Sequence, residues 1–191
     1  MPRLMAKFMK PLIIILLAGS LFFNGAVRAD DEGELLNKNG GFEEGKALYH
    51  IVRPEACTME ADDVYRGQFA MRIAGLDEND DSKADPMVVA GYKLGGVNSE
   101  FIFRCAVKTQ NVDPAHPPKI QLVVDKGEGM NATLPESAEL VFDRDMDWTP
   151  YEVKISGLPE SAVSIGFWIR VPRETQSVLL IDEIEVREIA R

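Results

Sequence analysis

Apolar and polar side chains alternate one by one in several separate stretches of this chain. Successive side chains of a β-strand point to opposite faces, so this alternation predicts strands with one core face and one wetter face. The stretches that alternate are Gln68–Ile73, Glu100–Lys108, Lys119–Asp125, Tyr151–Ile155 and Ser164–Val171. No stretch shows a sustained helical period. The pattern therefore predicts an all-β chain.

Turn and loop signals separate the predicted strands. They include Asn39-Gly40-Gly41, Asp77 to Asp85, Gly95-Gly96 and a Pro-rich loop from Asp113 to Pro118. Many short strands, each with one apolar face, are typical of an antiparallel β-sandwich. The chain of 191 residues has room for one such domain.

The first 29 residues have the three parts of a secretory signal peptide. Arg3, Lys7 and Lys10 form a positive start, a nearly unbroken apolar run extends from Leu12 to Phe23, and Val27-Arg28-Ala29 provides short side chains before a cut at Asp30. The alternative is an uncleaved membrane anchor, but the run is shorter than the roughly 20 residues that a span needs. We expect cleavage, a mature domain of residues 30–191, and a secreted or periplasmic protein with no membrane span.

Net charge excludes several kinds of partner. The formal charge of the whole chain is −10, and loss of the four cations of the signal peptide takes it to −14. Binding to nucleic acid requires a cationic footprint that neutralises phosphates, and docking on an anionic membrane surface requires clustered Lys and Arg. We therefore expect neither nucleic acid nor a membrane surface as a partner.

The two cysteines, Cys57 and Cys105, both lie in the exported part of the chain. An oxidising compartment permits a disulfide between them, and closing a loop of this length would contribute about 3–4 kcal/mol. The alternative is two buried free thiols, because a free cysteine is a common core residue. Sequence alone leaves both readings open.

Four motifs follow one another along the chain. They are a predicted first strand from Glu34 to Gly45 that contains Asn39-Gly40-Gly41-Phe42-Glu43, the stretch Val64 to Ile73, the stretch Trp148 to Val153, and a last strand from Val178 to Val186 with Asp182-Glu183-Ile184. Their order resembles the carbohydrate-binding modules that accompany cellulases and xylanases, which belong to the galactose-binding-domain-like jelly rolls. The resemblance covers about residues 34–189 and implies a jelly-roll sandwich that binds a polysaccharide or oligosaccharide.

The same resemblance implies a structural Ca²⁺ where the first and last strands meet. Its carboxylate ligands would be Glu43 and Asp182, with backbone carbonyls near Gly67, since calcium takes six to eight hard oxygen ligands. The alternative is that Glu43 and Asp182 are solvated acids at strand ends.

A candidate ligand face follows from strand alternation. Trp168 and Arg170 lie opposite the apolar Phe167 and Ile169, and the same rule puts Arg104 and Gln121 on the polar faces of their strands. If these strands share a sheet, a sugar could stack its C–H face on the indole of Trp168 while the polar side chains bind its hydroxyls. Gly166 would leave open space beside the ring. The competing role for Trp168 is a half-buried sheet residue covered by a loop.

No catalytic motif is present. The two histidines, His50 and His116, have no partner at metal-ligand spacing and are expected to be solvated loop residues. No nucleophile elbow, phosphate-binding loop or zinc-protease helix occurs. Three functions remain open: a non-catalytic carbohydrate-binding module, a structural or protein-interaction sandwich of the cell envelope, and a small glycan-active enzyme using two carboxylates.

Overall fold

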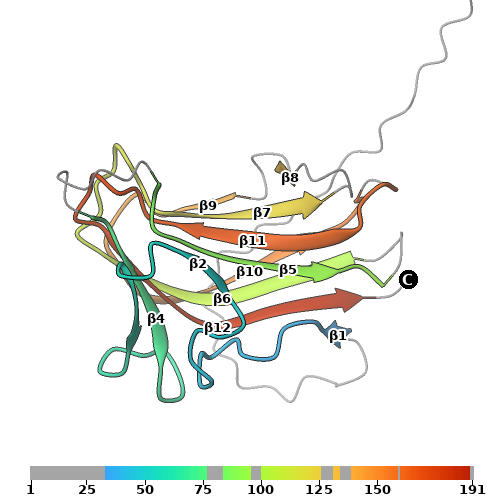
Figure 1. Cartoon of the computed structure of the whole chain (residues 1–191), viewed down its shortest axis with the longest axis horizontal. Helices are drawn as coiled ribbons and strands as arrows, with labels where there is room; N and C mark the ends of the chain where they lie inside the picture. Colours follow the sequence, from blue (N-terminus) through green and yellow to red (C-terminus); the bar gives the residue numbers. More distant parts are fainter. Residues whose placement is uncertain are drawn as a thin grey trace, which may run out of the picture.

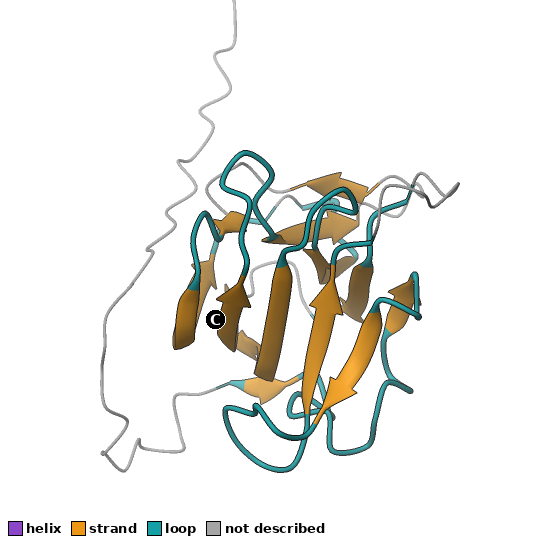
Figure 2. Cartoon of the chain, turned by 90° about the vertical axis from the view of Figure 1, so that its left-hand side faces the viewer, coloured by secondary structure: helices purple, strands orange, loops and turns teal. Residues whose placement is uncertain are grey.

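The structure, a computed structural model, describes residues 33–76, 84–95, 100–125, 131–133, 139–158 and 160–189. In this part of the chain there are twelve β-strands and no α-helix (Figure 1, Figure 2). The prediction of an all-β fold is confirmed. No described helix is long and apolar enough to cross a bilayer. The predicted signal peptide and most of the loop from Asp77 to Asp85 lie outside the described residues.

The strands form two antiparallel sheets that pack face to face (Figure 1). Sheet A has the order β10-β6-β12-β4-β3, and β1 also pairs with β12. Its strands are β1 (Glu34–Leu35), β3 (Cys57–Glu60), β4 (Ala70–Ala74), β6 (Glu100–Gln110), β10 (Met146–Ile155) and β12 (Val178–Ile189). Sheet B has the order β2-β5-β11-β7-β8, and β9 also pairs with β7. Its strands are β2 (His50–Val52), β5 (Met87–Lys93), β7 (Lys119–Asp125), β8 (Asn131–Thr133), β9 (Glu139–Val141) and β11 (Ser164–Arg170).

Each of the five alternating stretches contains or overlaps a strand, namely β4, β6, β7, β10 and β11. The predicted opening strand is the exception. Only Glu34–Leu35 is extended and paired, and the chain then turns, with Phe42 in the left-handed region at φ 57°. A non-glycine residue adopts that conformation only where its surroundings fix it. The ring of Phe42 is fully buried and lies 5.0 Å from that of Tyr49, so core packing holds the turn in place.

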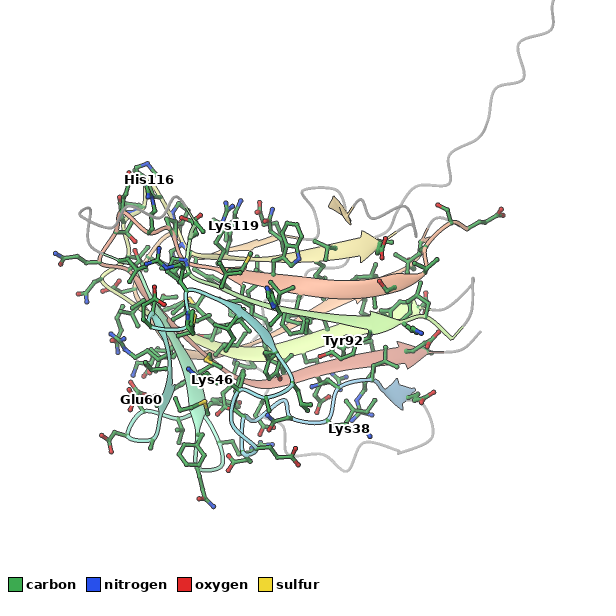
Figure 3. All side chains as sticks on the ribbon, in the orientation of Figure 1. Lys38, Lys46, Glu60, Tyr92, His116 and Lys119 are labelled. Atoms are coloured by element: carbon green, nitrogen blue, oxygen red, sulfur yellow. The ribbon has the colours of Figure 1, made fainter. Side chains whose placement is uncertain are left out.

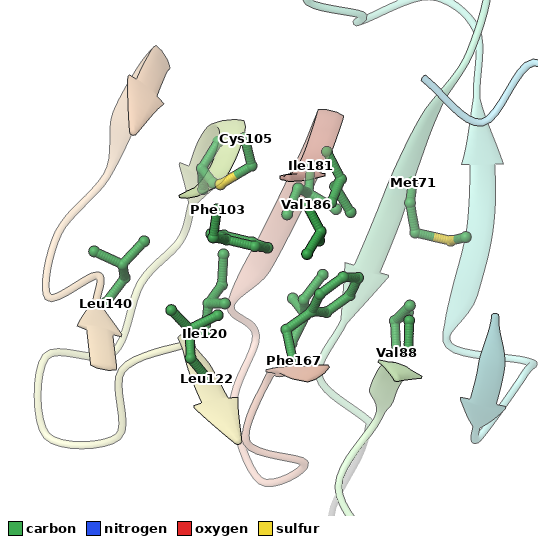
Figure 4. Packing of buried hydrophobic residues seen from close by; sticks show 14 of the residues in the cluster. Met71, Val88, Phe103, Cys105, Ile120, Leu122, Leu140, Phe167, Ile181 and Val186 are labelled. Atoms are coloured by element: carbon green, nitrogen blue, oxygen red, sulfur yellow. The ribbon is translucent and has the colours of Figure 1, made fainter. Parts of the chain in front are cut away.

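The core fills the space between the sheets. Figure 4 shows Phe103, Cys105, Ile181 and Val186 of sheet A facing Leu122, Phe167 and Val88 of sheet B. The ring centroids of Phe103 and Phe167 are 5.4 Å apart and join the two layers. Full burial of one such side chain contributes about 1.5–3 kcal/mol relative to leaving it exposed. Alternation had assigned Phe103, Cys105, Leu122 and Phe167 to the core, whereas Val88, Ile181 and Val186 lie outside the alternating stretches.

The last strand, β12, has a bulge between Asp182 and Glu185, and the segment that contains Asn37 and Gly40 packs against this bulge. Asn37 satisfies the bulged backbone, donating to the carbonyl of Ile184 at 2.5 Å and accepting from the N–H of Val186 at 2.7 Å. Gly40 lies so close to the carbonyl of Ile184 that no Cβ would fit. The opening turn is therefore shaped to pack on the last strand.

Candidate functional site

The outer face of sheet B carries the predicted ring. The pairing register puts five residues in one row across the sheet: His50, Val89, Trp168, Gln121 and Glu139. Trp168 and Gln121 are directly opposite each other on β11 and β7, and Arg170 lies on the same face two residues along β11. Trp168 is half-buried, so its ring is neither in the core nor fully exposed. Three of the four predicted ligand-binding residues therefore share one face.

Ion pairs surround the ring. Lys119, directly opposite Arg170, binds Glu139 with its ammonium group 2.6 Å from Oε1, and it points outward from the upper sheet in Figure 3. Arg170 Nε lies 3.5 Å from Oδ2 of Asp85. Two cations facing each other across neighbouring strands repel, and each has an acidic partner that reduces the repulsion. The indole ring therefore lies between Gln121 on β7 and Val89 on β5, with the two ion pairs nearby on the same face.

Arg104 is not part of this face, and its predicted role beside Trp168 is wrong. Arg104 lies on β6 in sheet A, where its Nε is 2.8 Å from Glu152 and its Nη1 is 3.4 Å from Glu185. Burial acts to lower the pKa of Arg104, but the hydrogen bonds and charges of Glu152 and Glu185 outweigh it and raise the pKa. Alternation gives the face on which a side chain lies but does not say which sheet its strand joins.

The open space predicted at Gly166 is also wrong. A Cβ at this position would meet the carbonyl oxygen of Ala90 and come within 3.1 Å of the Cα of Gly91. Gly166 is therefore required by the close approach of β11 to β5. Gly91, its direct partner across the two strands, is exposed, and a Cβ there would meet nothing nearer than 4.0 Å. The room next to Trp168 lies over Gly91 instead.

The two predicted calcium ligands meet at the loop between β3 and β4. Glu43 Oε1 accepts hydrogen bonds from the N–H groups of Gln68 and Phe69, at 2.8 and 3.3 Å. Asp182, which has no exposed surface, accepts from the N–H groups of Tyr65 and Arg66 at 3.1 and 2.9 Å. The two acids therefore bind neighbouring backbone N–H groups of one loop, and Glu43 comes from the opening turn rather than from a strand.

Burial raises the pKa of Asp182, as does the neighbouring charge of Glu183, while its backbone hydrogen bonds act to lower it. A Cβ placed on Gly41 would lie 3.3 Å from Oε1 of Glu183 and 3.8 Å from Oδ1 of Asp182, so carboxylate oxygens converge on a space that a glycine leaves open. In the described residues, no three His, Cys, Asp or Glu side chains are grouped closely enough to hold a metal by themselves. A Ca²⁺ ion here would need backbone carbonyls and water as well.

The cysteines are free, which overturns the disulfide reading. Cys57 lies on β3 and Cys105 on β6, with β4 and β12 between them in the same sheet. Three strand spacings separate them by about 14 Å, about twice the largest Cα distance that a disulfide spans. Burial raises the pKa of Cys57 to about 11 and that of Cys105 still further. Both thiols are therefore weak nucleophiles.

The histidines lie apart from each other. His116 is in the loop after β6, at the left end of Figure 3, and its Nδ1 is 2.9 Å from Oδ2 of the exposed Asp113. His50 is exposed, as expected, but it begins β2 and is not in a loop. Neither histidine belongs to a metal-binding group among the described residues.

Sequence reasoning missed a second aromatic cluster, on the outer face of sheet A. The rings of Tyr65 and Trp148 are tilted by 49°, with their centroids 5.9 Å apart, and Trp148 Nε1 donates to Oδ1 of Asp63 at 2.9 Å. Lys108 Nζ lies 2.9 Å from Oδ2 of the same Asp63. In the sequence, Trp148 stands out only as part of the motif shared with carbohydrate-binding modules. No periodic pattern links it to the loop between β3 and β4, which lies far away along the chain.

Comparison with known proteins extends the description of the fold. No family model matches the sequence, and no curated protein matches it. Several solved structures do match. A family 16 carbohydrate-binding module has a TM-score of 0.59 at 14% identity, with 79% of this chain and 98% of that chain covered. The xylan-binding domain of a Paenibacillus barcinonensis xylanase has a TM-score of 0.56 at 18% identity, with 85% and 99% covered.

A family 61 module solved with β-1,4-galactotriose has a TM-score of 0.53 at 16% identity, with 80% of this chain and 97% of that chain covered. These likenesses define the class to which the fold belongs: the jelly-roll sandwich of carbohydrate-binding modules, related to the galactose-binding domains. The resemblance inferred from the four motifs is confirmed at the level of fold. At these identities the match says nothing of a ligand for this chain.

Proposed function

We propose that this protein is a secreted, non-catalytic module that binds a glycan on the outer face of sheet B, with Trp168 as the stacking ring. The observation that carries the proposal is the row in which Trp168 and Gln121 lie directly opposite each other, with Arg170 on the same face. An indole presents an apolar surface to the C–H face of a pyranose, and the amide and the guanidinium provide hydrogen bonds to hydroxyls. The neighbouring exposed Gly91 leaves room for the sugar beside the ring.

The composition of this face favours a sugar over a protein partner. Trp168 is bordered on β7 by Lys119 and Gln121, and Lys119 is already paired with Glu139. Stable protein interfaces bury about 800 Å² on each partner around a desolvated apolar centre. A sugar needs only one ring and a few oriented polar groups, which is what this face offers. The solved modules of this fold that were captured with galactotriose or described as xylan-binding support the same ligand class.

The chemistry of the described nucleophiles supports a non-catalytic role. Both thiols have a raised pKa because they are buried, and His116 faces only an exposed aspartate. A nucleophilic cysteine requires a lowered pKa, and burial raises the pKa of both thiols here.

We also propose a structural Ca²⁺ at the meeting point of Glu43 and Asp182. The cation would relieve the repulsion between the Asp182 and Glu183 carboxylates, which approach each other beside Gly41. Bound metal would stabilise the contact between the opening turn and the last strand, and no part of glycan binding depends on it.

The test is a glycan array with the mature protein, in calcium and in chelator. Retention on a defined set of polysaccharides that is lost in Trp168→Ala supports the proposal. Retention on no glycan in either condition contradicts it and favours a structural sandwich of the cell envelope.

A further inference from the structure

Part of the outer face of sheet A is covered. Ala106 of β6, together with Leu180 and Asp182 of β12, points away from the core and is nevertheless buried. The β3–β4 loop, residues 61–69, contacts this face through the hydrogen bonds of Asp182, and Trp148 of β10 contacts the same loop. A loop and a tryptophan thus build a second, smaller layer on sheet A.

That loop is fixed rather than free. Its backbone N–H groups bind two carboxylates from outside it: Tyr65 and Arg66 donate to Asp182, and Gln68 and Phe69 donate to Glu43. From within the loop, Asp63 accepts from the indole of Trp148 and pairs with Lys108. Hydrogen bonds to charged groups are stronger than those between neutral groups. The loop therefore presents its side chains in one arrangement, and binding would cost little ordering entropy.

The side chains that the loop presents are of a recognition type. Tyr65 keeps 39% of its surface exposed although one side of its ring contacts Trp148. The guanidinium carbon of Arg66 lies 6.0 Å from the Tyr65 ring centroid, and 68% of that side chain is exposed. The guanidinium of Arg66 lies 3.6 Å from Glu183, and the ammonium of Lys108 lies 2.9 Å from Asp63 and 3.4 Å from Asp147. The exposed ring thus stands beside two cations whose positions are fixed by acidic partners.

We propose that Tyr65, Arg66, Trp148 and Lys108, the Tyr65 surface, form a second carbohydrate-contacting site on the opposite side of the sandwich from Trp168. The proposal goes beyond the function given above, which uses sheet B alone. Tyr65 would stack on one sugar unit, and Arg66 and Lys108 would donate to its hydroxyls or ring oxygen. The patch carries a guanidinium and an ammonium group, whereas the centre of a stable protein interface is depleted of charged residues.

Two sites on opposite faces would change how the module binds a polymer. Each site offers one main stacking ring, so each alone is expected to bind weakly. Engagement of both sites by neighbouring chains raises the overall avidity without any new contact. The protein would then link two glycan chains, whereas a single-site module only attaches to one.

The experiment is a calorimetric titration of the mature protein with xylohexaose and with β-1,4-galactotriose, in four forms of the chain. The wild type is expected to bind two ligands, Tyr65→Ala one, Trp168→Ala one, and the double variant none. Leu48→Ala, which removes another exposed apolar side chain at 54% exposure, is the matched control and should bind two. Arg66→Ala keeps both the Tyr65 ring and the backbone bonds to Asp182, and should weaken one of the two sites roughly three- to tenfold.

The outcomes separate the two proposals. One ligand on the wild type and none on Trp168→Ala would overturn the Tyr65 site and leave the sheet B site standing. One ligand on the wild type and none on Tyr65→Ala would overturn the sheet B site and leave the Tyr65 site standing, provided that the variant melts at the same temperature as the wild type. Binding of neither sugar by the wild type would overturn both.

Discussion

The indole N–H of Trp148 donates a 2.9 Å hydrogen bond to Asp63, which lies 85 residues earlier in the chain. This bond joins β10 at the edge of sheet A to the loop between β3 and β4 at the other side of the sheet. Lys108 of β6 shares the same carboxylate, so three parts of the chain meet at one aspartate. Trp148 is therefore a structural anchor for the loop, and the exposed Tyr65 depends on it for its position.

Trp168→Ala is expected to remove glycan retention while changing the melting temperature by no more than about two degrees. The ring is half-buried on an outer face, so its loss leaves no core cavity. Affinity electrophoresis in gels containing the polysaccharide, followed by a thermal melt, measures both effects. A variant that unfolds would show that the ring is structural, and one that binds as the wild type does would place the binding face elsewhere.

Gly166→Ala is expected to destabilise the protein by about 1–3 kcal/mol, because the added Cβ would meet the carbonyl of Ala90 on the neighbouring strand β5. Gly91→Ala is the matched control, since its Cβ enters open space and the two glycines are direct partners. Urea unfolding monitored by fluorescence gives the free energy of unfolding of each variant. Equal losses in the two variants would contradict the close approach of β11 and β5.

Chelator is expected to lower the melting temperature, because a metal that binds only the folded state stabilises it. Asp182→Asn removes the charge of the carboxylate but keeps the size of the side chain. This variant should therefore abolish the effect of calcium on the melting temperature. Differential scanning calorimetry with added Ca²⁺ or with EDTA is the measurement. An unchanged melting temperature, together with no calcium in elemental analysis, would remove the metal from the proposal.

Both thiols are expected to be inert in the native protein at pH 8, where a pKa of about 11 for Cys57 leaves only about one thiolate per thousand. The Cys105 thiol should react more slowly still, because burial raises its pKa further than that of Cys57. Titration with a chromogenic disulfide reagent should count two thiols per chain after unfolding in denaturant without reductant. A count of zero would mean that the cysteines are bridged.

Export is expected to remove residues 1–29. Mass spectrometry of the secreted or periplasmic product should find Asp30 as its first residue, as the short side chains of Val27 and Ala29 predict. A full-length product in the membrane fraction would show that the apolar run is an anchor.

Alternation predicted the strands and the face of each side chain, because a period of two follows directly from strand geometry. It put Trp168, Arg170 and Gln121 on outward faces, and these three share one face because β11 and β7 are neighbours. It failed for Arg104, because the partners of a strand are set by the topology of the whole sandwich. It also missed β5, whose start, Met87-Val88-Val89-Ala90, is an unbroken apolar run.

The details of the site depend on backbone geometry that residue types do not encode one by one. Gly166 was interpreted as leaving open space beside Trp168, but a Cβ added to it would run into the backbone of β5. Phe42 was read as part of a strand, but the surrounding core holds it in a left-handed turn. The contact of Trp148 with Asp63 joins segments with no local signal in common. In each case the deciding neighbour is distant in sequence.

The position of β12 in sheet A bears on how the protein is made. Val178–Ile189 lies between β6 and β4, so the strands on its two sides have no connection across the sheet until this segment is present. During synthesis, sheet A remains in two parts until this segment has left the ribosome. A nascent chain in that condition cannot complete its core prematurely. The same strand order that closes the sandwich therefore delays completion of the core until β12 is available to pair with both neighbours.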